Sequence, residues 1–141
     1  MVHEIFSLEK LVKLKVRHPN AKVIAHPECE EPVLREADFV GSTTQLLNYA
    51  KNNPANEFIV ATEAGILHQM VKQAPHKTFI PAPPDNSCAC NDCPHMKRNT
   101  LEKVYLCMEY EQPELVMDEE LRVQAKKSLD RMLEISAQIG L

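Results

Sequence analysis

The stretch Glu57-Phe-Ile-Val-Ala-Thr62 decides the fold of this chain. It places four apolar residues in a row, shortly after the turn signal Asn52-Asn-Pro54 and just before the acidic residue Glu63. A short continuous apolar run between such boundaries is typical of a strand in a sheet that is covered on both faces. We therefore expect a parallel sheet with helices on either side of it.

The flanking sequence repeats this pattern. Strands are expected at 21–26, 38–41, 57–62 and 78–81, with helices at 7–17 and 29–36, after Ser42 and after Glu63. Strands that alternate with helices predict an α/β fold. We expect a three-layer αβα sandwich with a short four-stranded parallel sheet, plus C-terminal helices. The predicted organisation is one domain over 1–141, with a leading helix (1–18), an α/β core with a cysteine loop (19–97) and C-terminal helices (98–141).

The C-terminal segment has its own helix signals. Asn99-Thr-Leu-Glu102 resembles a capping box with asparagine as the cap, which opens a helix to about residue 111. Asp118 is expected to cap a last helix whose apolar residues, Leu121 to Leu133, have the spacing of one buried face. Cys107 lies among apolar residues of the preceding helix, so we expect it in the core.

Composition limits the possible functions. The chain has 141 residues, 44% hydrophobic and 26% charged, and a formal net charge of −4. This balance argues against a nucleic-acid or membrane-surface protein, which normally carries a basic stripe. No apolar run approaches the roughly 20 residues of a membrane span. The start of the sequence does not resemble a signal peptide and the five cysteines do not form a secreted disulfide pattern, so we expect a cytoplasmic protein.

Polar residues follow the predicted strands. His26 and Glu28 come after the first strand, and Ser42 and Thr43 after the second. Ligands of open parallel sheets bind beyond the carboxyl ends of the strands, so these side chains are candidates for one site. His26 and Glu28 suit acid–base chemistry, or serve only as a strand end and a first-turn acid. Ser42 and Thr43 suit an anion, or form only a helix cap.

The cluster Cys88-Ala-Cys90-Asn-Asp-Cys93-Pro-His95 suggests a metal. Thiolates are soft ligands for iron or zinc, although a tetrahedral zinc site needs four protein ligands and usually takes them from separated pairs. If the cluster itself binds zinc, the alternative function is a small zinc-binding α/β module without catalytic activity. Cys29 stands alone at a helix start, which is more typical of a small buried side chain.

Taken together, these motifs resemble a known family. His26-Pro-Glu28-Cys29, Asp38-Phe-Val-Gly-Ser42-Thr43 and Cys93-Pro-His-Met96-Lys-Arg-Asn99, with the closing helix, are similar in order and spacing to the C-terminal third of quinolinate synthase. The resemblance implies an enzyme of de novo NAD biosynthesis that condenses iminoaspartate with dihydroxyacetone phosphate. It also implies three similar domains around a [4Fe-4S] cluster, each supplying one cysteine.

The resemblance assigns roles to individual residues. Cys93 matches the third cluster ligand, and His26 and Glu28 match a pair that binds substrate and moves protons. Ser42 and Thr43 match hydroxyls that hold a substrate anion, and His3 matches the histidine of a Cys-x-x-His motif. Cys29 is not a ligand in this family, and Cys88 and Cys90 are variable.

The resemblance covers only the third domain. The cysteine of the Cys-x-x-His motif would fall just before Met1, so we expect Met1 to be an internal methionine of a longer parent chain. The N-terminal domains of the same enzyme are then the missing partners. Because one certain ligand cannot anchor a cluster, this chain alone is expected neither to retain it nor to be active.

Overall fold

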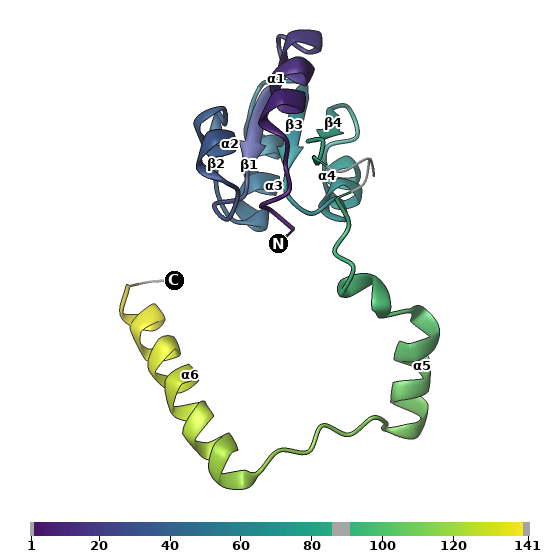
Figure 1. Ribbon diagram of the computed structural model, residues 1–141, viewed down its shortest axis with the longest axis vertical. Helices are drawn as coiled ribbons and strands as arrows, with labels where there is room; N and C mark the ends of the chain where they lie inside the picture. The colour runs from purple at the N-terminus through teal and green to yellow at the C-terminus, as the bar shows by residue number, and fades with distance from the viewer. Residues whose placement is uncertain (1, 86–90, 140–141) are drawn as a thin grey trace. The chain divides into compact units, whose positions relative to one another are not determined.

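The structure is a computed structural model that describes residues 2–85 and 91–139. The chain divides into two compact units, Met1–Arg98 and Asn99–Leu141, which are described separately. Figure 1 shows both units along the chain. The predictions for Cys88 and Cys90 lie outside the described residues.

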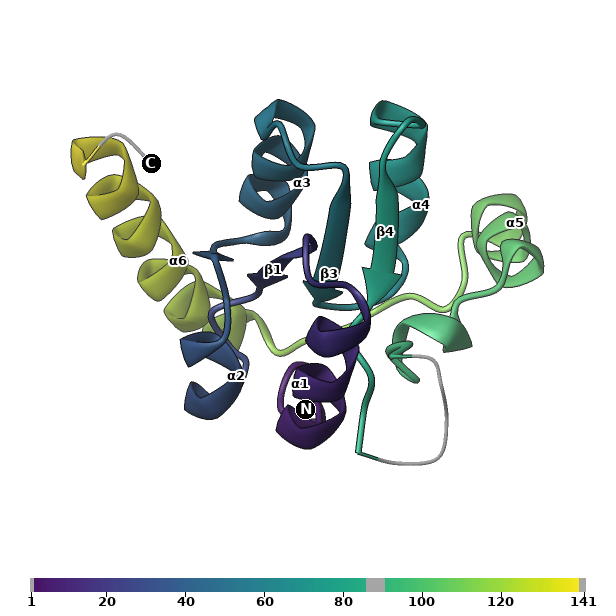
Figure 2. The ribbon, with the colours of Figure 1, turned by 90° about the horizontal axis from the view of Figure 1, so that it is seen from above.

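The first unit is built on a parallel sheet. Its strands are β1 (Lys22–Ala25), β2 (Phe39–Val40), β3 (Glu57–Ala61) and β4 (Thr78–Pro81), in the order β2-β1-β3-β4. All three neighbouring pairs are parallel. Figure 2 shows α1 (Leu8–Arg17) and α2 (Glu31–Arg35) on one side of the sheet, and α3 (Thr43–Asn52) and α4 (Ile66–Gln73) on the other. The predicted three-layer α/β fold is confirmed.

Alternation along the central strands creates two cores. Val23 and Ile59 pack in one buried cluster with Leu11 of α1. Ile24 and Phe58, which are the sequence neighbours of Val23 and Ile59, pack in a second cluster against α3 and α4. Successive strand residues point to opposite faces, so a continuous apolar run buries both faces at once. The apolar run at 57–62 therefore forms a strand that is covered on both faces, as expected.

Side-chain caps form at the starts of α1 and α3, where the sequence predicted them. The Ser7 hydroxyl accepts a hydrogen bond from Lys10 N at 3.5 Å and begins α1. At α3, the Ser42 hydroxyl accepts from Gln45 N at 3.4 Å, while Gln45 Oε1 accepts from Ser42 N at 2.7 Å. This reciprocal pair is a capping box and satisfies two backbone donors that would otherwise lack partners.

A buried lysine closes the other end of α3. Lys77 is only 8% exposed. Its Nζ donates to the backbone oxygen of Ala50 at 2.7 Å and to that of Asn53, and it lies 5.4 Å from the centre of the Phe58 ring. A cation at a helix C-terminus is favourable because it meets carbonyl groups that have no partner within the helix.

The second unit holds α5 (Leu101–Tyr110), α6 (Glu119–Ile139) and their connection. As predicted, Asp118 accepts from Leu121 N at 3.0 Å at the start of α6. The predicted Asn99 cap is wrong by one residue, since the Thr100 hydroxyl accepts from Lys103 N at 3.2 Å instead. Thr100 has the correct extended backbone, and its third successor is lysine, so no capping box forms.

Two burial predictions for the second unit are also wrong. Cys107 is exposed, and Leu133 of α6 is 61% exposed. None of the described residues of α5 or α6 is buried. Helical periodicity indicates that a helix has an apolar face, but it does not supply a partner surface for that face within the same unit. Among the described residues, no helix has the length and apolar character needed to cross a membrane.

Candidate functional site

The segment before α1 carries His3 to the carboxyl ends of the strands. Ile5 to Ser7 runs antiparallel to Pro83–Asp85, with a bridge between Phe6 and Pro84. Ser7 N donates to Pro83 O at 3.0 Å, and Asp85 N donates to Ile5 O at 2.8 Å. These contacts hold the N-terminal segment beside the chain that leaves β4.

Three predicted site residues lie together at this edge. His3 Nδ1 is 2.9 Å from Glu28 Oε2, and His26 Nδ1 is 3.9 Å from the same oxygen. The two imidazole rings are stacked, with centroids 4.0 Å apart. His26 follows β1 directly, so the strand end places it, whereas His3 comes from 23 positions earlier in the chain.

Hydrogen bonds assign the protons of this cluster. An ionised carboxylate only accepts, so the His3 Nδ1 that faces Glu28 carries the proton. His3 Nε2 lies 3.2 Å from the Thr62 hydroxyl, which donates to it when the ring is neutral and accepts from it when the ring is protonated. Glu28 N donates to His26 Nδ1 at 3.3 Å, which leaves the proton of a neutral His26 ring on Nε2.

Burial, charge and hydrogen bonding lower the pKa values of His26 and Glu28. Burial, followed by the charge of His3, lowers the pKa of His26 below its ordinary 6.5, against the opposing effect of Glu28. The hydrogen bond from His3, followed by the charge of His26, lowers the pKa of Glu28 below 4.5. Near pH 7 the cluster therefore contains a neutral His26 beside an ionised Glu28, a pairing suited to taking up and returning a proton.

The same three residues are a poor site for a single metal ion. One donor atom from each lies within 4.8 Å of the others. However, the two imidazole planes are only 13° from parallel at a separation of 4.0 Å. Imidazole lone pairs lie in the ring plane, so stacked rings do not point at one common position. The arrangement favours sharing protons or binding a polar substrate.

A hollow of about 410 Å³ adjoins His3. It is lined by His3, Thr43, Thr62, Glu63, Gly65, Ile66, Gln69 and Met96. Thr43 is the first residue of α3, and Gly65 is the cap of α4, so two helix N-termini border this space. Helix N-termini favour anions because their first backbone N–H groups lack partners within the helix. This applies to the start of α3, whereas Gly65 N at the start of α4 already donates to Glu63 Oε2 at 2.8 Å.

The predicted hydroxyl pair separates in the structure. Thr43 lines the hollow beside His3. Ser42 does not, and its hydroxyl accepts from the backbone of its own helix. Its local role is therefore that of a cap, which was one of the two alternatives for this residue. A second hollow, of about 520 Å³, lies over Phe39 and Tyr49 and has only amides as polar side chains other than the tyrosine.

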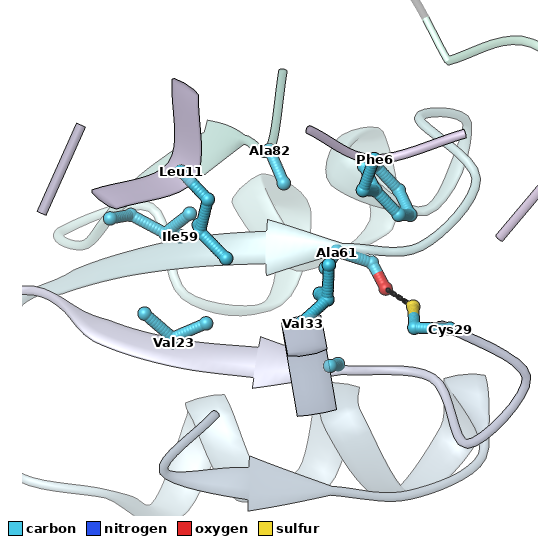
Figure 3. Packing of buried hydrophobic residues seen from close by; sticks show 9 residues of the cluster. Phe6, Leu11, Val23, Cys29, Val33, Ile59, Ala61 and Ala82 are labelled. Carbon is cyan, nitrogen blue, oxygen red and sulfur yellow. Dashed lines mark hydrogen bonds between the residues drawn. The ribbon is translucent and has the colours of Figure 1, made fainter. Parts of the chain in front are cut away.

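The described cysteines differ in their environment. Cys93 is partly exposed, in a turn where its carbonyl accepts from Lys97 N at 3.1 Å. Cys29 is 5% exposed, and its thiol donates to the carbonyl of Ala61 at 3.3 Å, as Figure 3 shows. Burial raises the pKa of the Cys29 thiol to about 11. The prediction that Cys29 is a small buried side chain is confirmed.

Sequence reasoning does not give the partners of two residues of this region. Thr62 is expected at the strand end that borders the site, and the structure shows that its hydroxyl contacts His3. Asn91 was noticed only as part of the cysteine cluster, yet it is 1% exposed and contacts both Val2 and Thr62. An asparagine between two cysteines gives no local sign of burial, so sequence alone offered no signal for it.

With this geometry established, comparison with known proteins decides the family. The model of the family described as quinolinate synthetase A protein matches residues 1–134. The chain belongs to the quinolinate synthase family. It is 60% identical over 136 residues to the quinolinate synthase of Rippkaea orientalis and 57% identical over 136 residues to that of Chloroherpeton thalassium.

The match covers almost all of this chain but less than half of its relatives. It spans 96% of the chain and 42% of the Rippkaea orientalis protein. For the Synechococcus quinolinate synthase, 59% identical, the shares are 97% and 43%. The curated relatives therefore contain further sequence that this chain does not match.

Proposed function

We propose that this chain forms the C-terminal part of a quinolinate synthase that acts in NAD biosynthesis in the cytoplasm. The complete enzyme would condense iminoaspartate with dihydroxyacetone phosphate, releasing phosphate and two water molecules to form quinolinate. Family membership supports the activity. The observation that carries the assignment of the site is the His3–His26–Glu28 cluster beside a hollow that the start of α3 borders.

The donor set fits one contribution to an iron–sulfur cluster. Cys93 is the thiol suited to hold an iron, because it is partly exposed within the first unit. Cys29 is unsuited, because its thiol is buried, donates to Ala61 and has a raised pKa. When bound, a [4Fe-4S] cluster with one open iron supplies a Lewis acid for dehydration. The remaining cluster ligands would come from the N-terminal domains, which are the proposed partners.

The chain's own residues would bind substrate and move protons. Glu28 is ionised and His26 neutral near pH 7, so either can accept a proton in one step and return it in a later one. His3 Nδ1 donates a hydrogen bond to Glu28, which keeps that carboxylate oriented toward the ring stack. Thr43 and the start of α3 would hold a carboxylate or phosphate of the substrate. Ser42 would contribute mainly by fixing the start of α3.

The isolated chain should be inactive. A cluster that needs ligands from three directions cannot be anchored by Cys93 alone. Anaerobic reconstitution of the 141-residue chain with iron and sulfide should therefore leave little bound metal. A stoichiometric iron–sulfur chromophore would contradict this, and tight binding of zinc without iron would favour a metal-binding module instead.

A chimera tests the function directly. In the Rippkaea orientalis quinolinate synthase, the matching 136-residue segment is replaced by that of this chain. We expect quinolinate to form from iminoaspartate and dihydroxyacetone phosphate. Glu28→Gln and Cys93→Ser should reduce turnover by about 100-fold or more, since each removes a group in contact with substrate or cluster.

Matched controls separate these roles from folding. Cys29→Ala changes another cysteine of the same unit and should retain activity, because Cys29 makes only an internal contact. Cys93→Ser should lose iron, whereas Glu28→Gln should keep it. An active Cys93→Ser chimera with its full iron content would refute the proposed ligand, and an inactive parent chimera that retains its iron would refute the proposed activity.

A further inference from the structure

Asn91 is buried where polar side chains rarely are. It lies two positions before Cys93 and is 1% exposed. Its backbone carbonyl accepts from Ala64 N at 3.1 Å, just beyond the end of β3. Its side-chain Nδ2 donates to Val2 O at 3.0 Å and to Thr62 O at 3.3 Å. One residue thus joins three segments that are distant in sequence.

These contacts lead directly to the histidine cluster. Val2 is the residue before His3, so the bond to its carbonyl fixes the backbone that carries the His3 ring. Thr62 provides both the carbonyl that Asn91 contacts and the hydroxyl that lies 3.2 Å from His3 Nε2. Asn91 therefore restrains His3 from its own backbone and from the residue that contacts its ring.

The orientation of the amide group follows from its partners. Both atoms that face Nδ2 are carbonyl oxygens, which only accept hydrogen bonds. A flipped amide would place its oxygen against two other oxygens. Among the described residues, no hydrogen-bond partner faces the buried Oδ1 of Asn91 in this orientation. The two bonds donated by Nδ2 therefore hold the amide in this buried position.

We propose that Asn91 is a positioning residue that couples the turn of Cys93 to the geometry of the His3–His26–Glu28 cluster. Its importance for catalysis rests on the function proposed above, but its effect on the histidine rings does not. Through Asn91, movement of the cysteine turn displaces His3 and opens the ring stack. Assembly of the turn around its ligand would in this way set the orientation of the groups that move protons.

Substitution of Asn91 tests the coupling in the 141-residue chain itself. Asn91→Asp keeps the shape of the side chain but cannot donate to Val2 and Thr62 when ionised. Asn91→Ala removes the same donors without adding a charge. Asn48→Asp makes the same chemical change at an exposed position of α3 and serves as the control. The readout is the nuclear Overhauser effect between the ring protons of His3 and His26, which are stacked.

We expect the inter-ring effect to weaken or disappear in both Asn91 variants and to persist in Asn48→Asp. The amide signals of β1 and β3 should be retained in a variant that still folds. If Asn91 only supported folding, the ring stack would be unchanged in such a variant. An unchanged ring stack in folded Asn91→Ala would overturn the proposal.

A measurement without any substitution covers the case in which both variants unfold. The side-chain amide protons of Asn91 should exchange with solvent at least about 10-fold more slowly than those of Asn48, since only the former are buried and bonded. Equal exchange rates would overturn the proposal. Neither experiment uses substrate or cluster, so their outcome is independent of whether the proposed enzyme activity is correct.

Discussion

Cys29 should be chemically inert in the folded chain. The reaction of a thiol with iodoacetamide requires the thiolate, and burial raises the pKa of Cys29 from an ordinary 9.0 to about 11. At pH 8, about 9% of an ordinary thiol is ionised, against about 0.1% of Cys29. Ionisation alone therefore slows alkylation about 90-fold, and the 5% exposure of the residue slows it further.

Mass spectrometry of the alkylated peptides measures this rate. The native chain is treated at pH 8, quenched at intervals and digested, with Cys107 as the accessible internal reference. Cys107-containing peptides should be modified first. In urea the two cysteines should react at similar rates, because unfolding removes the burial that protects Cys29.

Two results would refute the reasoning. One is native alkylation of Cys29 as fast as that of Cys107. The other is a rate for Cys29 that stops rising before pH 10, since a thiol with a pKa of about 11 should gain about 10-fold per pH unit below that value. Either result would mean that the thiol is not held against Ala61, and that Cys29 is accessible to a metal ion.

Two further predictions concern stability. Lys77→Met keeps the apolar stem but removes the hydrogen bonds to Ala50 and Asn53. Urea denaturation should therefore show that the free energy of unfolding falls by about 2–3 kcal/mol. The control Lys72→Met, at an exposed position of α4, should lower it by less than about 0.5 kcal/mol. The lowered pKa of His26 means that folding favours its neutral ring. The contribution of His26 to the free energy of unfolding is therefore complete above its unfolded pKa of 6.5, and it is lost as pH falls through the lower pKa of the folded state. The free energy of unfolding should therefore fall from pH 7 to pH 5, and less so in His26→Gln; an equal fall in both would show that His26 is not the group responsible.

The elements of the first unit could be predicted because their signals are local. The apolar run at 57–62, the caps at Ser7 and Ser42, and the turn at Pro54 each determine structure within a few residues. The placement of His26 at a strand end followed from the same reasoning. In the second unit, local signals gave the helices but not the exposure of Leu133, because burial depends on a partner surface elsewhere.

The candidate site was predictable only in part. His26 and Glu28 are two residues apart, so their proximity was already implied by the chain. His3 was identified only by resemblance to a family, since it stands before the first helix and follows no strand. The involvement of Thr62 and Asn91 requires contacts across 59 and 89 positions of sequence, and no pattern within a short window indicates these.

Sequence patterning alone predicted the order of strands and helices along the chain, the two apolar faces of the sheet and the capped starts of α1 and α3. It could do so because side-chain periodicity and capping act over a few residues. The tertiary structure decided which polar groups meet: His3 against Glu28, Asn91 against Val2, and Cys29 against Ala61. These contacts arise only when the sheet brings distant segments to one edge. Burial there lowers the pKa of His26 and raises that of Cys29, while the hydrogen bond from His3 lowers the pKa of Glu28.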